Sequence, residues 1–263
     1  MTVPSLATRA LDLIATEWIK LRSVRSTYWA LLVTVVTPIA VASLVAFAFA
    51  SAPHAAGQQA APPPDPLLPE LLSLEYAVIA VSVLGVLAFS GEYSTGLIRV
   101  TFTAAPRRRA VLAAKAAVLA AVMLVVGEAV AFASFGLTQA VLAGHGDGVS
   151  LGHPGVPGAV LCTGLLLAVC ALLGLALGAI VRHTAGGIAA TIAVIVIPGI
   201  VALLPSPWSG RIGRFTLLEA ARQVSALHPA TNLFAPAWSL LIVLAWPAVA
   251  LAAAAVLITR RDA

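Results

Sequence analysis

Charged side chains are scarce in this sequence. Asp, Glu, Lys and Arg make up only 10% of its 263 residues, whereas 61% are hydrophobic. Soluble domains carry about 25% charged and about 45–50% apolar residues. The composition therefore excludes an ordinary soluble domain. It predicts an all-α polytopic membrane protein, because helices satisfy their own backbone hydrogen bonds in hydrocarbon.

Cysteine is almost absent as well. Cys162 and Cys170 lie within one apolar run, and their spacing fits neither a metal site nor an extracellular disulfide framework. We expect both to be small packing residues. The glycine-rich stretch of residues 144–157 contains two histidines and one aspartate without metal-ligand spacing. No metal site is predicted.

Two motifs that would carry chemistry are missing. The sequence has no G-x-x-x-x-G-K-[ST] phosphate loop and no H-E-x-x-H zinc motif. The chain is therefore not expected to be an enzyme or to hydrolyse ATP by itself. Its formal net charge of +5 does not indicate a nucleic-acid partner, because the basic residues lie beside apolar runs without interleaved aromatic residues.

Long apolar runs are abundant. A membrane-spanning helix needs about 20 mostly apolar residues. Six segments are predicted as spans, at residues 28–50, 71–89, 110–135, 159–181, 187–204 and 237–258. The third run stays apolar to about Leu142, which suits a tilted span. We expect one transmembrane domain over residues 1–263 and an uncleaved first span, because the basic segment before it is too long for a signal peptide.

The 15 Lys and Arg residues are distributed unevenly. Eleven lie before the first span, between the second and third, between the fourth and fifth, or after the sixth, and a twelfth, Lys115, lies just inside the third span on the same side. The remaining three, Arg211, Arg214 and Arg222, lie in one connection on the other side. Cytoplasmic loops retain an excess of Lys and Arg, so both termini are predicted to be cytoplasmic.

Residues 8–26, before the first span, have the periodicity of an amphipathic helix. Apolar residues recur on one face, at Leu11, Ile14, Trp18 and Leu21. This pattern is typical of a helix that lies in the membrane interface, with Trp18 at headgroup depth and the lipid as a partner. A solvated leader helix is the alternative.

Residues 90–109 connect the second and third spans. We expect Gly91 to end the second span and Pro106 to prevent a continuous helix into the third. The stretch between them mixes charge with Leu97, Ile98 and Val100, which are expected to be exposed. A short helix with an apolar face outside the membrane indicates a protein partner.

Two acids lie within the predicted spans, Glu75 in the second and Glu128 in the third. An ionisable group at mid-span costs about 2.5–3.5 kcal/mol on translocon scales, so both are functional candidates. They could relay protons. Alternatively, each could pair with one of the three arginines of the outer side, Arg211, Arg214 or Arg222, or face a water-filled vestibule.

Two further patterns concern packing. The connection at residues 205–236 is expected to contain one short helix, at residues 211–227, in which Glu219 and Arg222 are spaced for a surface ion pair. Gly174 and Gly178 in the fourth span permit close helix approach, which we expect to occur within the chain rather than at a dimer seam.

Four stretches together resemble one protein family. They read Glu17-Trp18-Ile19-Lys20-Leu21-Arg22-Ser23; Gly91-Glu92-Tyr93 through Gly96-Leu97-Ile98-Arg99; Pro106-Arg107-Arg108-Arg109 with Ala113-Ala114-Lys115; and Arg260-Arg261-Asp262-Ala263. In this order and spacing they look like the permease subunits of type-2 ABC exporters, especially the actinobacterial kind. The similarity covers essentially the whole chain.

The resemblance implies a permease in a bacterial plasma membrane that pairs with a second copy or a sister subunit. Two cytoplasmic ATPase subunits, which bind ATP and Mg, would drive it, and this chain would bind no cofactor. The family's helix before the first span contacts the ATPase, which implies such a role for Glu17, Trp18 and Lys20. The 90–109 loop would be the coupling helix, whose residues here are Glu92, Tyr93, Gly96, Leu97, Ile98 and Arg99.

The sequence departs from this family after the fifth span. Phe215-Thr216-Leu217-Leu218-Glu219 stands where such proteins often have a proline-serine-asparagine stretch. The substrate is therefore not implied, although a small amphipathic or hydrophobic compound suits such apolar spans. Two other functions stay open: a proton-coupled secondary transporter that uses Glu75 and Glu128, and a non-transporting membrane scaffold subunit.

Overall fold

Helices account for all the regular structure in the described part of a computed structural model of the chain, which comprises residues 6–51, 65–104, 107–144, 148–231 and 233–260. In chain order they are α1 (Leu6–Ser23), α2 (Arg25–Ala50), α3 (Leu68–Ser94), α4 (Leu97–Ala104), α5 (Arg108–Ala143), α6 (Val156–Val181), α7 (Thr184–Ala202), α8 (Trp208–Gly213), α9 (Leu217–Ser225) and α10 (Pro236–Arg260). Six of them, α2, α3, α5, α6, α7 and α10, are long and apolar enough to cross a membrane. The predicted six-span, all-helical class is confirmed.

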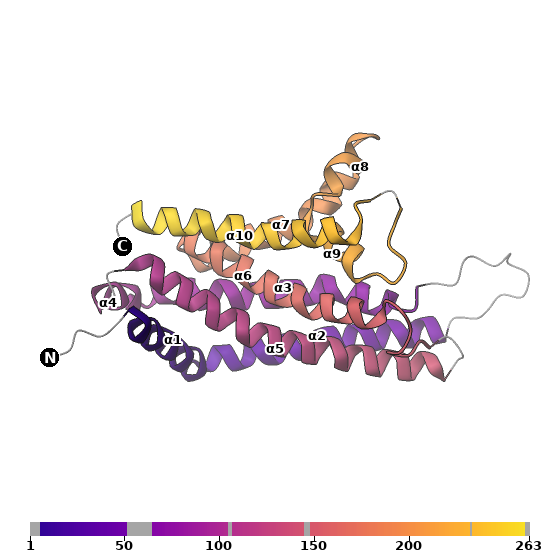
Figure 1. The fold of residues 1–263 in the computed structure, drawn as a ribbon, viewed down its shortest axis with the longest axis horizontal. Coiled ribbons are helices and arrows are strands. Elements are labelled where there is room, and N and C mark those ends of the chain that lie inside the picture. Colours follow the sequence, from indigo (N-terminus) through magenta and orange to yellow (C-terminus); the bar gives the residue numbers. More distant parts are fainter. Residues whose placement is uncertain (1–5, 52–64, 105–106, 145–147, 232, 261–263) are drawn as a thin grey trace, which may run out of the picture.

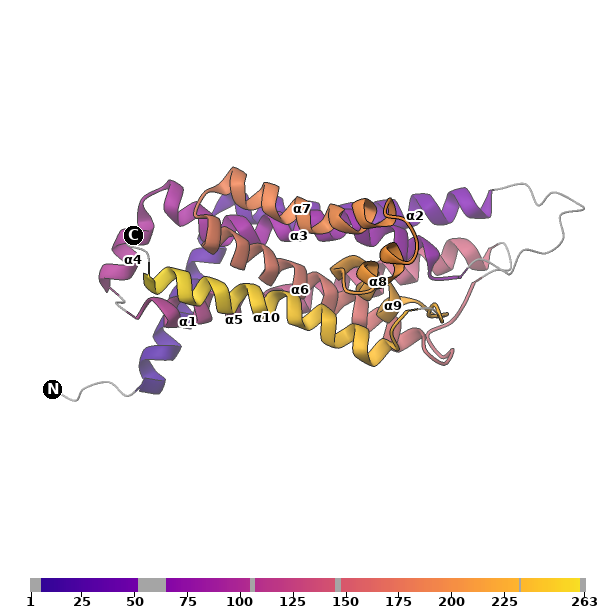
Figure 2. The same cartoon turned by 90° about the horizontal axis from the view of Figure 1, so that it is seen from above.

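The six long helices run side by side and form an elongated bundle (Figure 1). α1, α4 and the last turn of α10 lie at one end, here called the α1–α4 end, and α9 lies towards the other, the α9 end. α1 runs roughly crosswise to the long helices (Figure 2). Of the twelve basic residues counted on one side of the predicted membrane, Arg261 lies outside the described residues. The other eleven belong to the α1–α4 end by their place in the chain, since they lie in or near the helix ends that meet there.

α3 is longer than the predicted second span at both ends. It begins three residues earlier because Pro69 is acceptable in a first helical turn. The prediction that Gly91 ends this helix is wrong: α3 continues to Ser94, and the hydroxyls of Ser94 and Thr95 each donate to the Gly91 carbonyl at 2.9 Å. The chain then reverses at Gly96, whose φ of 72° is in the left-handed region that glycine adopts readily.

The connection at residues 205–236 also differs from the prediction. It contains two short helices, α8 and α9, rather than one helix over residues 211–227. The break falls at Arg214–Thr216, where the Arg214 guanidinium lies over the rings of Phe215 and Phe234, at 5.4 and 4.7 Å from their centroids. Phe215 packs edge-on against Phe234, so aromatic contacts replace a helical turn.

α6 is the central helix, in contact with α3, α5, α7, α9 and α10. It packs closely against α3, because a Cβ at Gly174 would collide with the Ser82 carbonyl and a Cβ at Gly85 would collide with the Ala171 carbonyl. The expected close approach at Gly174 and Gly178 within the chain is confirmed. Of the two cysteines, Cys170 is buried in this core and Cys162 is half-buried.

Replacement of Gly174 by valine should therefore force α3 and α6 apart. Overpacked cores lose about 1–3 kcal/mol. The thermal midpoint of the purified protein, measured by size-exclusion chromatography after heating, should fall for Gly174→Val. Gly136→Val is the matched control because open space surrounds Gly136 in α5. Equal losses in the two variants would contradict a close α3–α6 contact.

Candidate functional site

Four charged side chains meet at the α1–α4 end. Glu17 and Lys20 come from α1, Glu92 comes from the last turn of α3, and Lys115 comes from the third turn of α5. Lys115 Nζ lies 2.5 Å from Glu17 Oε2 and 2.8 Å from Glu92 Oε1. Lys20 Nζ lies 2.9 Å from Glu17 Oε1 and 3.0 Å from Glu92 Oε1. Each carboxylate thus contacts both ammonium groups, and the four form a charge network with no net charge.

Helical geometry explains how these side chains meet. Residues three apart share a helix face, so Glu17 and Lys20 point the same way from α1. Continuation of α3 through Gly91 keeps Glu92 on the helix, from where it faces the beginning of α5. Lys115 lies seven residues beyond Arg108, the first residue of α5, and therefore two turns inside the bundle. An ionisable residue at such a depth requires a partner, and it has two.

The charge network is largely withdrawn from water. The side chains of Glu17, Lys115 and Glu92 are 4%, 7% and 10% exposed, and that of Lys20 is 33% exposed. Removal of one member from such a cluster leaves an unpaired buried charge and typically costs about 3–5 kcal/mol. Burial of all four charged side chains together costs far less free energy, because each charge has an opposite charge at hydrogen-bonding distance.

The pKa of Lys20 is raised by its partners. Burial acts to lower its pKa, but the hydrogen bonds and negative charges of Glu17 and Glu92 outweigh this and raise the pKa above 10.5. A lysine with a raised folded-state pKa contributes its full stabilisation below the unfolded value and loses it as the pH rises through the folded value. The contribution of Lys20 is therefore constant across the physiological range.

α4 is joined to the charge network through its inner face. Thr101 contacts both sides of it, with Oγ1 accepting from Lys20 Nζ at 3.2 Å and donating to Glu92 Oε2 at 3.4 Å. Ile98 and Phe102 are buried on the same face and belong to the main core. The expectation that Ile98 is exposed is wrong, because one helical turn places Ile98 beside Phe102 and opposite Leu97.

The outer face of α4 remains open. Leu97 and Val100 are 54% and 66% exposed, and Trp18 on α1 is also exposed. Only the backbone of Arg99 is described, in α4, and its side chain lies outside the described part of the structure. Beside these residues, an open cavity of about 1480 Å³ extends between α1, α4 and the adjoining ends of α3 and α5, and the charge network lines it.

Further contacts connect this end to the rest of the bundle. The Arg182 guanidinium, between α6 and α7, lies 5.5 Å from the ring centroid of Tyr93. The hydroxyls of Ser90 and Thr184 are hydrogen-bonded at 3.0 Å, which joins α3 to the first turn of α7. Arg108 lies 5.2 Å from the ring centroid of Phe102 and donates to the Ile258 carbonyl of α10 at 3.2 Å. α4 is therefore linked by side-chain contacts to α3, α5 and α10.

The two predicted intramembrane acids have different environments. Glu75 forms an ion pair with Arg222, which also pairs with Glu219 at 2.9 Å, so the expected Glu219–Arg222 pair and one of the alternatives for Glu75 are confirmed. Burial raises the pKa of Glu219 and lowers that of Arg222. Glu128 pairs with no arginine in the described residues, and its Oε2 has no hydrogen-bond partner.

Metal binding and nucleophilic catalysis find little support in the described residues. Within the described ranges, no group of three or more His, Cys, Asp or Glu residues could hold a metal ion. Gly148-Val149-Ser150-Leu151-Gly152 matches the G-x-S-x-G spelling of a nucleophile elbow, but it lies in the exposed connection between α5 and α6 rather than between a strand and a helix. A scan against protein-family models finds no match for the chain, and a search of curated proteins finds no similar sequence.

Sequence reasoning selected Glu17, Lys20 and Glu92 but not their mutual contact. It missed Thr101 altogether. It counted Lys115 among the basic residues and within a stretch that resembles the family, but assigned it no role in the site. The available signal was the position of Lys115 inside an apolar helix, where a lysine needs an acidic partner.

Replacement of Lys115 should test the charge network directly. Lys115→Met removes the cation that both buried carboxylates share and should destabilise the protein by about 3–5 kcal/mol. Combination with Glu17→Gln should cost less than the sum of the two single changes, because the second change removes a charge that the first leaves unpaired. Thermal unfolding of the purified variants measures both effects.

Arg109→Met is the matched control, since Arg109 is an exposed basic residue on the same helix. A destabilisation equal to that of Lys115→Met, or strict additivity with Glu17→Gln, would refute the proposed energetics.

Proposed function

We propose that the chain is the membrane-spanning permease subunit of an ATP-driven exporter of the type-2 ABC kind, powered by separate ATPase subunits. One observation carries this proposal. The two segments that the family resemblance assigns to the ATPase contact are α1 and α4. They are joined by the buried charge network of Glu17, Lys20, Glu92 and Lys115, to which Thr101 of α4 is hydrogen-bonded. Such an assembly suits force transfer from a partner into the bundle.

In this proposal Glu92 has a role different from the one the resemblance suggested. Its carboxylate is occupied by Lys20, Lys115 and Thr101, so it holds α1 and α4 in position instead of contacting the ATPase. The ATPase contact falls to the exposed apolar side chains of α4, Leu97 and Val100. An apolar helix face that docks into a partner's groove is a common recognition mode.

The proposed direction of force follows the contacts of α4. ATP binding in the partner would displace α4 and α1 together, and their contacts would move the adjoining ends of α3, α5 and α10. The cluster of basic residues supports a cytoplasmic location for this end, where ATP is available. Small amphipathic or hydrophobic compounds are the proposed substrate class, on the apolar character of the spans alone.

The contacts of Glu75 argue against the alternative of a proton-coupled secondary transporter. A proton relay through Glu75 and Glu128 requires both to bind and release protons, but Glu75 is half-exposed and paired with Arg222. A non-transporting scaffold subunit would need α1 at the membrane, but its function would not require α4 to be fixed to the charge network. The observations therefore favour the permease.

Charged substitutions on α4 should test the partner contact. Leu97→Asp with Val100→Asp should leave folding intact, because both side chains are exposed. It should abolish the copurification of ATPase activity with the protein that we expect for the wild type. Leu203→Asp is the control, since Leu203 is an exposed leucine at the opposite end of the bundle. Undiminished copurification and ATP hydrolysis in the α4 variant would reject this docking face.

Orientation can be measured separately. With both termini cytoplasmic, green fluorescent protein fused after Ala263 should fluoresce, and alkaline phosphatase fused at the same site should be inactive. Both reporters should switch if fused instead between α7 and α8, at Leu204. The opposite result would place the α1–α4 end outside the cell and exclude an ATPase contact there.

A further inference from the structure

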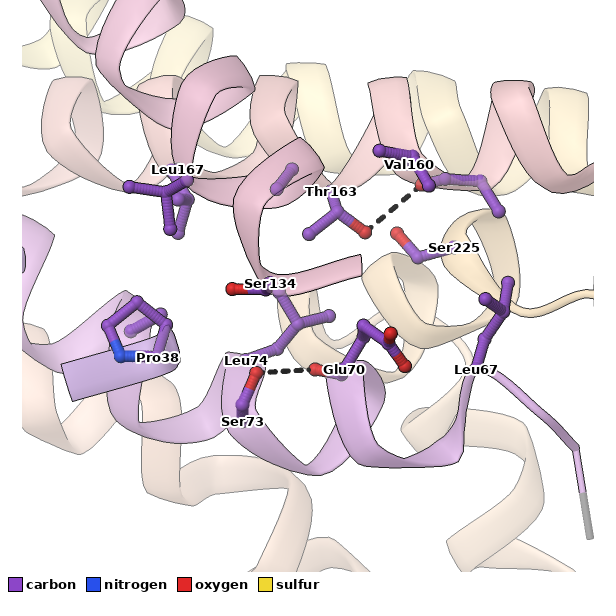
Figure 3. A pocket seen from close by; sticks show the side chains of 14 residues that line it. Pro38, Leu67, Glu70, Ser73, Leu74, Ser134, Val160, Thr163, Leu167 and Ser225 are labelled. Carbon is purple, nitrogen blue, oxygen red and sulfur yellow. Dashed lines mark hydrogen bonds between the residues drawn. The ribbon is translucent and has the colours of Figure 1, made fainter. Parts of the chain in front are cut away.

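A second polar site lies near the α9 end of the bundle. Five helices meet around a small cavity there, namely α2, α3, α5, α6 and α9. Figure 3 shows Glu70 of α3, Ser134 of α5, Thr163 of α6 and Ser225 of α9 around it. The space open to the centre of a water molecule is about 20 Å³. One water needs about 10–15 Å³ by this measure, so the cavity accommodates a single water.

Three buried oxygen atoms of residues that line this cavity have no hydrogen-bond partner. They are Glu70 Oε2, Ser134 Oγ and Ser225 Oγ, and their residues are 7%, 4% and 2% exposed. Buried polar atoms are nearly always hydrogen-bonded, and each exception requires an explanation. A water in the cavity would donate to Glu70 Oε2 and accept from a serine hydroxyl, and so supply partners that the described side chains do not.

The contacts of the other carboxyl oxygen, Glu70 Oε1, bear on whether Glu70 is protonated. Oε1 contacts the hydroxyl of Thr138, and this hydroxyl also lies 2.9 Å from the Ser134 carbonyl and 3.1 Å from the Phe135 carbonyl. A hydroxyl has one hydrogen, whereas carbonyls and ionised carboxylates only accept. If Glu70 were ionised, its Oε1 would take the one hydrogen of the Thr138 hydroxyl, which then could not donate to either carbonyl of α5. A protonated Glu70 donates to Thr138, which then donates to a backbone carbonyl.

The surrounding charges agree with this assignment. The cavity lining from α2, α5, α6 and α9 carries no charged residue. Asp65, in the segment before α3, is another carboxylate and faces His228 at 3.8 Å. On α9, Arg222 pairs with Glu75 and Glu219 instead. An ionised Glu70 would thus be buried without a cation, at a cost of several kcal/mol.

We propose that Glu70 is a proton-binding site that holds a carboxylic acid and one ordered water at the junction of α9 with the bundle. This assignment does not depend on the proposed transport function. It has a mechanical consequence, because separation of α9 from α3 would admit solvent and let the acid release its proton. The closed arrangement then binds one more proton than the open one, so acidic conditions favour closure and basic conditions favour opening.

Infrared spectroscopy of the purified protein in lipid should detect this acid. A carbonyl band of a protonated carboxylic acid should persist at neutral pH, shift in D₂O and disappear in Glu70→Gln. Glu75→Gln is the matched control, because Glu75 lies on the same helix, is half-exposed and pairs with Arg222. Glu128→Gln identifies any band that belongs to Glu128. A Glu70→Gln spectrum identical to that of the wild type would overturn the proposal.

Two milder variants keep the test decisive if Glu70→Gln does not fold. Thr138→Val removes the acceptor of the acid and should shift its band without abolishing it. Ser225→Val fills the cavity, displaces the water and should also shift the band. The thermal midpoint should fall from mildly acidic to mildly basic pH in the wild type and change less in Glu70→Gln. Unshifted bands in both milder variants, or equal pH dependence, would refute the site.

Discussion

The contact of Lys115 with two carboxylates determines the arrangement of one end of this protein. A lysine two turns inside an apolar helix is unfavourable in hydrocarbon unless a partner reaches it. Glu92 reaches it because α3 continues past Gly91, and Glu17 reaches it because α1 lies across the end of the bundle. The crosswise α1, the long α3 and the inward face of α4 are thus consequences of one buried cation that had to be neutralised.

The two ends of the bundle neutralise their buried carboxylates differently. At the α1–α4 end, Glu17 and Glu92 are balanced by lysines, which fixes the mutual positions of three helices. At the α9 end, no cation among the described residues pairs with Glu70, and the proposed compensation is a proton. Ion pairs suit a rigid connection, whereas a proton can leave when the site opens. α6 packs closely against α3 at Gly174, and this contact couples the movements of the two helices.

The sequence predicted what depends on local composition and missed what depends on contacts between distant segments. Six spans were predictable because length and apolarity are properties of each segment alone. The ends of α3 were not: Pro69 and Gly91 resemble helix breakers, yet the first-turn position of Pro69 and the charge partners of Glu92 outweigh their preferences. For the same reason the predicted second span, at residues 71–89, left out Glu70, which is buried in the first turn of α3.

The residues of the candidate site also divide into those that the sequence predicted and those that only contacts between distant segments reveal. Glu17, Lys20 and Glu92 could be named from their resemblance to a family, but the burial of Ile98 and the participation of Thr101 require the fold of α4 against α3. The Glu75–Arg222 pair was one of several possibilities, because Arg211, Arg214 and Arg222 are equivalent in sequence. Only the separation of α8 from α9 at Arg214–Thr216 directs Arg222 towards α3.

The neutrality of the charge network has an electrical consequence. A single charge that crosses a membrane does work of about 2.3 kcal/mol for every 100 mV of potential. Glu17, Lys20, Glu92 and Lys115 sum to zero charge, so they can shift together along the membrane normal with almost no work against the membrane voltage. The voltage-dependent work of a movement at this end would therefore come from its other basic residues and not from the charge network.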